Sequence, residues 1–187
     1  MSVAAIEQHS GPWTLDDVLA LPEDSHHRVE LVGGALLMSP NPTIDHQGAS
    51  YRLHVLLEAA IQAAGAALDV REAVNVIVPD GLLIPDVVVA DAEAIRKGGV
   101  ALHAHDVSIV IEIASPSTRV ADKRLKPSLY AAAGIPHYWR VELSPVPRLY
   151  LGRLELGGYV ERLVQSGETT ALAEPFPLDL DPARLLQ

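Results

Sequence analysis

The chain has 187 residues, of which 49% are hydrophobic, so it is long and apolar enough to bury the core of one ordinary domain. It contains no cysteine, which excludes disulfide bonds and thiolate metal sites and suits a reducing cytoplasm, the location we expect. No run of about twenty apolar residues exists that could cross a membrane. The net charge of −10 is opposite to that of proteins whose whole surface binds nucleic acid. A nucleic-acid site would therefore need a local basic patch or a metal centre.

The N-terminal third of the sequence predicts a flexible leader followed by the start of a single domain. Residues 1–12 have the composition of a leader, and residues 13–187 form the domain. The stretch "TLDDVLALPED" predicts a short helix with Thr14 as its N-cap. "HRVELVGGALLMSP" predicts two strands joined at a Gly-Gly turn. The segment from "NPTIDHQ" onward predicts a long helix that ends at Gly65, because apolar residues recur there at helical spacing.

The remaining sequence alternates between strand and helix patterns. "ALDVREAVNVIVPDG" and "LLIPDVVVAD" each predict one strand, and "KGGVALHAHD" predicts a loop. "VSIVIEIA" is the most apolar strand, which favours a central position with both faces covered. "RVADKRLKPSLYAAAG" predicts a helix, and three more strands follow it: "PHYWRVEL", "PRLYLGRLEL" and "GYVERLVQ". The pattern indicates an α/β or α+β fold, a mixed β-sheet flanked by helices with an N-terminal hairpin and C-terminal strands.

Two carboxylates belong to the most apolar strands. Asp86 opens "DVVVA", and Glu112 lies in the middle of "VSIVIEIA". If these strands are neighbours, both acids converge on one point, where two buried carboxylates would repel each other unless a cation joins them. A hard divalent cation such as Mg²⁺ or Mn²⁺ is the natural partner for such oxygens. The alternative is that backbone N–H groups or an arginine satisfy each acid separately.

Basic residues concentrate just after Glu112. They are Arg119, Lys123, Arg124 and Lys126, four of the fourteen Lys and Arg in the chain. In a helix, Asp122, Lys126 and Tyr130 would share one face. An ordinary solvated helix face is the alternative interpretation. Pro127 would disrupt a helix interior, so the helix could instead begin near Lys126 with the proline in its first turn.

These segments together resemble the Uma-two family, which is named for restriction endonucleases and belongs to the PD-(D/E)XK nuclease superfamily. The resemblance rests on "RVELVGGALLMSP", "DHQ", "IPDVVVA" and "VIEIASPSTRVADKRLKPSLYAAAGIPHYWRVE", roughly residues 14 to 165. It implies a restriction-endonuclease-like fold. Asp86 matches the acid of the "PD" element and Glu112 matches the second acid. The superfamily's usual lysine position holds Ala114 here, and Lys126 matches a lysine displaced to the next helix.

The resemblance further implies a Mg²⁺- or Mn²⁺-dependent endonuclease that hydrolyses DNA phosphodiester bonds. Asp86, Glu112, Glu30 and the Ile113 carbonyl would hold metal, and Lys126 would act on water or phosphate. The roles expected of the other residues are phosphate contact for Arg119, Lys123 and Arg124, and support behind the site for His46, Asp122 and Tyr130.

Two other functions fit the same residues. A degenerate member of the family could bind nucleic acid or assemble with other subunits without cutting, and a metal-dependent hydrolase could act on a small phosphate compound instead of a polynucleotide. Because an acidic monomer should bind DNA weakly, a homodimer with paired sites is a further expectation. The sequence identifies neither a recognition site nor the strandedness of the substrate.

Overall fold

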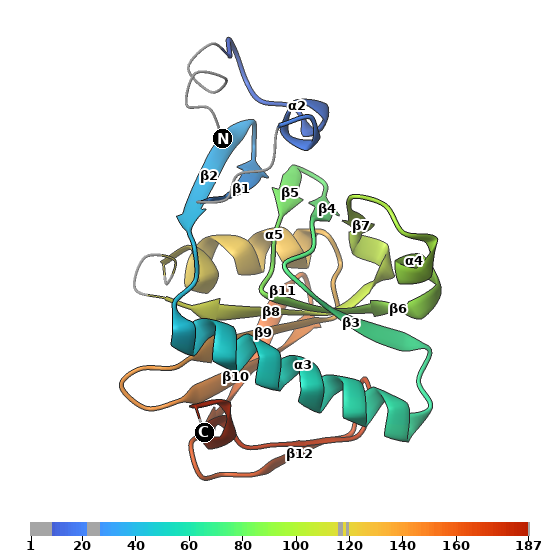
Figure 1. Cartoon of the computed structure of the whole chain (residues 1–187), viewed down its shortest axis with the longest axis vertical. Coiled ribbons are helices and arrows are strands. Elements are labelled where there is room, and N and C mark those ends of the chain that lie inside the picture. The colour runs from blue at the N-terminus through green and yellow to red at the C-terminus, as the bar shows by residue number, and fades with distance from the viewer. Residues whose placement is uncertain (1–8, 22–26, 116–117, 119, 187) are drawn as a thin grey trace.

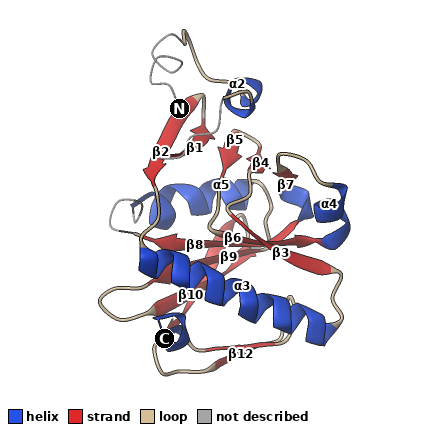
Figure 2. Cartoon of the chain, in the orientation of Figure 1, coloured by secondary structure: helices blue, strands red, loops and turns tan. Residues whose placement is uncertain are grey.

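The computed structural model describes residues 9–21, 27–115, 118 and 120–186. In this part of the chain the strands form two mixed sheets and a separate hairpin, with helices packed on them (Figures 1 and 2). The expected α/β class is therefore confirmed, although we expected one mixed sheet and the structure has two. The proposed leader lies largely in residues 1–8, outside the described part of the chain. No described helix is long and apolar enough to cross a membrane.

The larger sheet has six strands in the order β11-β10-β9-β8-β6-β3. Its strands are β3 (Leu68–Glu72), β6 (Val87–Asp91), β8 (Val107–Ala114), β9 (His137–Glu142), β10 (Arg148–Glu155) and β11 (Gly158–Gln165). Strand β8 pairs antiparallel with β6 and parallel with β9, so it is central, as its apolar sequence predicts.

The smaller sheet has five strands in the order β2-β1-β5-β4-β7. They are β1 (His27–Val32), β2 (Ala35–Pro40), β4 (Val76–Val78), β5 (Gly81–Leu83) and β7 (Leu102–His103). Strands β1 and β2 form the predicted hairpin around Gly33 and Gly34, both of which have positive φ. The separate hairpin pairs β12 (Thr170–Leu172) with β13 (Leu178–Leu180).

The helices are α2 (Leu15–Leu19), α3 (Ile44–Ala64), α4 (Ala92–Lys97), α5 (Lys126–Ala132) and the short 3₁₀ helices at 104–106 and 182–186. Three of them, α2, α3 and α5, lie where the sequence predicts helices, and the others were not predicted. Thr14 caps α2 in a capping box with Asp17, and Gly65 ends α3 in the left-handed conformation. Helix α4 was not predicted, because we assigned no element between the strand before it and the "KGG" loop.

The helix after β8 differs from a regular α-helix. A π-helical turn over Ala121–Leu125 leads into α5, which begins at Lys126 and carries Pro127 in its first turn. A proline is tolerated there because the first N–H groups of a helix have no partner within it. The second of the two sequence interpretations is therefore confirmed.

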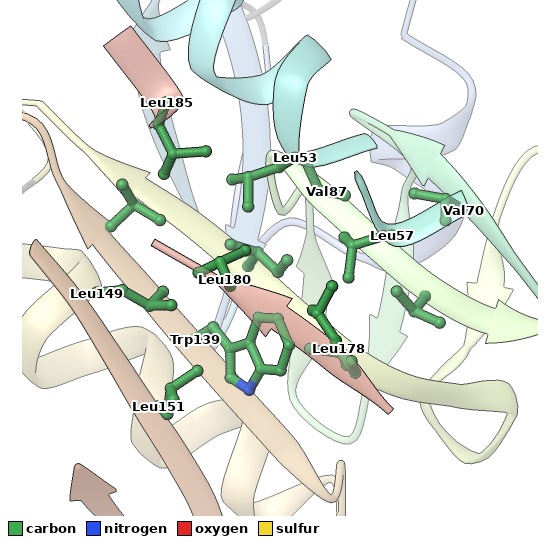
Figure 3. Packing of buried hydrophobic residues seen from close by; sticks show 14 of the residues in the cluster. Leu53, Leu57, Val70, Val87, Trp139, Leu149, Leu151, Leu178, Leu180 and Leu185 are labelled. Carbon is green, nitrogen blue, oxygen red and sulfur yellow. The ribbon is translucent and has the colours of Figure 1, made fainter. Parts of the chain in front are cut away.

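Two hydrophobic clusters cover the two faces of the six-stranded sheet. On one face, α3 contributes Leu53 and Leu57, which pack with Trp139 and with residues of the C-terminal hairpin (Figure 3). On the other face, Tyr130 of α5 packs with Val110 and other residues of a second cluster. Full burial of a leucine side chain contributes about 1.5–3 kcal/mol. The site residues of β8 therefore lie in a closely packed layer between the two clusters.

Two predicted strands are wrong as single elements. The residues of "ALDVREAVNVIVPDG" divide into β3 and β4, which belong to different sheets, and the chain turns between them at Ala73 with φ of 51°. Likewise, "LLIPDVVVAD" divides into β5 and β6 at the segment 84–86. Pro85 lacks an N–H group, which prevents a continuous ladder through this segment. Both crossings carry the chain from one sheet to the other beside the site. In the predicted "KGGVALHAHD" loop, the structure forms β7 and a 3₁₀ turn.

Candidate active site

Asp86 and Glu112 converge as the sequence predicts, because β6 and β8 are neighbours. Val87 lies opposite Ile111 in the antiparallel register, which places Asp86, one residue earlier, beside the end of β8. Asp86 Oδ2 accepts a hydrogen bond of 2.7 Å from the backbone N–H of Ile113. The pairing of β6 with β8 ends at Val87 and Ile111, so the Ile113 N–H bonds to the Asp86 side chain instead of to a β6 carbonyl.

Glu112 points to the face of the sheet that α5 covers. Alternation along β8 turns Ile111 and Ile113 toward α3 and Glu112 toward α5. Its Oε1 atom lies 3.1 Å from Lys126 Nζ and accepts a hydrogen bond of 2.8 Å from the Tyr130 hydroxyl. Only 2% of Glu112 is exposed, so this carboxylate is held by protein groups in a nearly dry environment.

Lys126 links three acids. Its Nζ atom lies 3.0 Å from Glu30 Oε1, 3.1 Å from Glu112 Oε1 and 3.7 Å from Asp122 Oδ1. Glu30, on β1, also accepts a hydrogen bond of 2.8 Å from the Ile84 N–H. As predicted, Asp122, Lys126 and Tyr130 share one face of the helix, and all three are buried.

Asp86 has two further partners, one of which the sequence analysis missed. His46, near the start of α3, places Nε2 3.1 Å from Asp86 Oδ2. Arg28, on β1, forms an ion pair through Nη1 with Asp86 Oδ1. An arginine and a backbone N–H satisfy Asp86, which is the arrangement that we considered as the alternative to a metal. Arg28 escaped notice because a lone arginine in a hairpin strand has the pattern of a solvent-facing residue.

The electrostatics of the cluster follow from burial and from an excess of acids. Burial raises the pKa of Glu112 well above its usual value; the Lys126 ammonium opposes this shift, and Asp122, Asp86 and Glu30 add to it. Burial also raises the pKa of Asp122. The pKa of Lys126 rises because Glu112, Glu30 and Asp122 outweigh the opposing effect of burial. Lys126 is therefore an ammonium, and the cluster favours holding an additional proton.

Asp86 behaves differently from Glu112. Burial alone would raise its pKa, but hydrogen bonding and charge from His46, the charge of Arg28 and the Ile113 N–H outweigh it and hold the pKa below its usual value. The ionised form is therefore favoured more strongly at Asp86 than at Glu112. The two acids sit in environments that push their pKa values apart, an arrangement common at functional sites.

These side chains line one cavity of about 220 Å³. Its polar walls are Arg28, Glu30, His46, Asp86, Glu112 and Lys126. The segment 39–43, which runs from the end of β2 to the residue before α3, completes the lining together with Ile84, Ile113, Ser115 and Thr118. The cavity lies where the five-stranded sheet meets the six-stranded sheet, and each sheet contributes acids to it.

Of the three predicted phosphate-binding residues, two lie outside this cavity and the third is not among the described residues. Lys123 and Arg124 are exposed on the π-helical turn and do not line the cavity. Arg119 lies outside the described residues. Ile113 lines the cavity. Because the N–H and C=O of one strand residue face the same edge, its carbonyl faces the same side as the N–H that binds Asp86.

The cavity offers oxygen donors to a divalent cation. Within the described residues, no group of three or more His, Asp or Glu is spaced as a ready-made metal site. The chemistry of the cavity nevertheless fits a hard cation. Glu30 and Glu112 both line the cavity, and the contacts described above engage the Oε1 atom of each acid. The acids of the cluster, Glu30, Asp86, Glu112 and Asp122, also outnumber the permanent cations Arg28 and Lys126. Oxygen donors with surplus negative charge suit Mg²⁺ or Mn²⁺.

The architecture matches a protein of known structure. A crystal structure from Anabaena variabilis ATCC 29413, described as "a putative nuclease belonging to DUF820", superposes with a TM-score of 0.71 at 20% sequence identity. The match covers 94% of this chain and 98% of that chain. At this identity the likeness establishes the fold, which is that of the DUF820 structure.

The sequence matches the Uma2 family, described as "Putative restriction endonuclease", over residues 15–185. The chain therefore belongs to the Uma2 family, as the motifs indicate. No curated protein matches it.

Proposed function

We propose that this protein is a divalent-metal-dependent endonuclease that hydrolyses DNA phosphodiester bonds at the cavity between the two sheets. The observation that supports the proposal is the position of Lys126, whose ammonium lies between Glu30 and Glu112 in the cavity that Asp86 also lines. A lysine beside carboxylates in a cavity is suited to phosphoryl chemistry, which needs metal ligands and a fixed positive charge.

Four groups would hold the cation: the carboxylates of Asp86, Glu112 and Glu30 and the carbonyl oxygen of Ile113. When bound, Mg²⁺ or Mn²⁺ supplies charge neutralisation at the phosphoryl oxygens and makes water more acidic. His46 and the Ile113 N–H keep Asp86 ionised and oriented. The Tyr130 hydroxyl fixes the Glu112 carboxylate through Oε1, and Oε2 would hold the cation.

Lys126 retains donor capacity for the reaction. An ammonium has three N–H donors, and two of them point to Glu30 and Glu112 at 3.0 and 3.1 Å. Asp122 at 3.7 Å is beyond hydrogen-bond distance, so the third donor remains for water or a phosphate oxygen. Lys126 would orient the attacking water and stabilise the charge that develops on the phosphate. Asp122 would support it as a nearby negative charge.

Binding of DNA must overcome the net charge of −10. Lys123 and Arg124, exposed on the turn before Lys126, would contact phosphates that flank the reacting one, together with Arg119. The contribution of each should decrease as salt concentration rises. A homodimer that presents two such surfaces to one duplex would strengthen binding.

The test is metal-dependent cleavage of supercoiled plasmid by the unaltered protein and by Lys126→Ala and Glu112→Gln. Lys97→Ala is the matched control, because Lys97 also follows an acid at i+4 but is an exposed surface residue. Nicking should require Mg²⁺ or Mn²⁺, persist in the control and be lost in both site variants. Cleavage that survives both site variants would contradict the proposed site. Hydrolysis of nucleotides but not of plasmid would favour a small-phosphate hydrolase, and metal binding without any hydrolysis would favour a non-cutting protein.

A further inference from the structure

Both carboxylate oxygens of Asp86 have partners among the described residues, and Arg28 is one of these partners. Asp86 Oδ1 is paired with Arg28, and Oδ2 faces His46 at 3.1 Å and the Ile113 N–H at 2.7 Å. By contrast, Glu30 and Glu112 make their contacts with described residues through Oε1. Asp86 is therefore the ligand that a cation could reach only after a partner has left it.

Of the partners of Asp86, Arg28 is the one that can leave. The Ile113 N–H is fixed in the central strand β8, and His46 is buried in α3. The Arg28 side chain is 26% exposed, whereas that of Asp86 is 6% exposed. A long side chain at the edge of a cavity can change rotamer at low cost, but a strand backbone and a buried imidazole cannot.

Arg28 would remain at the site after leaving Asp86. It lies two residues before Glu30 on β1, so both side chains face the same side of the strand, and both line the cavity. The planar guanidinium carries five N–H donors and binds phosphate oxygens through two parallel hydrogen bonds. The side chain that now blocks a metal ligand is therefore suited to contact an anionic substrate in the same cavity.

We propose that Arg28 competes with the divalent cation for Asp86 and, once displaced, binds a phosphate oxygen of the substrate. This inference rests on the proposed function, because it assigns Arg28 a role at the same site. Metal and substrate then assist each other: the cation releases Arg28 from Asp86, and a phosphate gives the released guanidinium a new anionic partner. Such reciprocal assistance is a coupling between two ligands, and removal of Arg28 should abolish it.

The test measures Mn²⁺ affinity by titration calorimetry in Arg28→Gln and in Arg28→Met, which keeps the apolar stem of the side chain. Arg71→Gln is the matched control, because Arg71 also pairs with an aspartate, Asp69 at 2.8 Å, but outside the cavity. Loss of a charge-assisted bond to the ligand should tighten Mn²⁺ binding about tenfold or more in the two Arg28 variants. The control should bind Mn²⁺ as the unaltered protein does.

The second measurement is the affinity for a short duplex oligonucleotide, followed by fluorescence anisotropy with and without Ca²⁺. In the unaltered protein Ca²⁺ should strengthen duplex binding, and in the Arg28 variants this enhancement should be lost. Unchanged or weaker Mn²⁺ binding in both variants, while the unaltered protein binds Mn²⁺, would overturn the role of Arg28 and leave the proposed metal site intact. If no version binds Mn²⁺, the proposed function itself is wrong. Circular dichroism of each variant verifies that the fold is retained.

Discussion

Lys126 Nζ lies 3.0 Å from Glu30 Oε1, and this contact joins the helix that covers the six-stranded sheet to a strand of the five-stranded sheet. Both side chains are buried, so the pair connects the two layers through a charge interaction in an environment with little water. The same ammonium also contacts Glu112. The ion pairs that support the proposed chemistry therefore also hold the two sheets together.

The first prediction concerns loss of this cation. Lys126→Met keeps the apolar stem but leaves the neighbouring carboxylates without their ammonium. Breaking a buried ion pair typically costs about 3–5 kcal/mol, and we expect a loss of this order in the free energy of unfolding. Urea denaturation measures it. The control Lys97→Met, at an exposed pair, should change stability by less than about 0.5 kcal/mol. An equal loss of unfolding free energy in both variants would show that the buried ion pairs of Lys126 stabilise the fold no more than the exposed pair of Lys97.

The second prediction concerns pH. The folded pKa of Glu112 lies above its ordinary value of 4.5, so its contribution to stability is fully present below that pH and is lost as pH rises through the folded value. Glu112→Gln removes this titration. The difference in free energy of unfolding, variant minus unaltered protein, should therefore increase as the pH rises above 4.5. Denaturant titrations at several pH values measure it. A difference that stays constant or falls would mean that Glu112 is ionised in the folded protein.

The third prediction concerns metal and stability. A cation that binds only the folded protein raises stability, by about 2.7 kcal/mol at a concentration one hundred times its dissociation constant. Thermal unfolding should shift upward with Mn²⁺ and return on addition of a chelator. The shift should be much smaller in Glu112→Gln, and Glu93→Gln, an exposed acid on α4, should retain it. A full shift in Glu112→Gln would place the cation elsewhere.

The fourth prediction concerns the core beneath the site. Leu53 of α3 is fully buried against the six-stranded sheet, and Val55 on the same helix is 44% exposed. Leu53→Ala should reduce the free energy of unfolding by about 2–5 kcal/mol, because it removes buried methyl groups and leaves a cavity. Val55→Ala should cost less than about 0.5 kcal/mol. Denaturation of both variants tests whether α3 presents the face seen in Figure 3.

Elements with strong local signals could be predicted from the sequence. Thr14 and Gly65 mark helix ends through their own backbone and side-chain preferences, and the apolar run of β8 indicates a strand covered on both faces. The common face of Asp122, Lys126 and Tyr130 follows from helical spacing, whereas the spacing left open whether this face is buried or solvated. Each of these features is set by residues that lie close together in the sequence. It can therefore be predicted from one sequence alone.

Other features depend on contacts between distant segments. The alternating and apolar patterns from 67 to 91 indicate strands, but they carry no information on which sheet each strand joins. The sequence therefore predicts β3 with β4, and β5 with β6, as single elements. The role of Arg28 depends on Asp86, which reaches it only because the chain changes sheets at Pro85. No local pattern separates such an arginine from a solvated one.

The π-helical turn over Ala121–Leu125 lies directly before Lys126 in the chain. A π-helical turn contains one more residue than the α-helical turn that it replaces. Removal of one residue, for example the exposed Arg124, would restore regular α-helical winding and leave Lys126 at about the same angular position, because the turn absorbs the extra residue within itself. The ammonium would then still reach Glu30 and Glu112. The π-helical turn is thus a place where the chain can lose a single codon without moving the lysine out of the cavity.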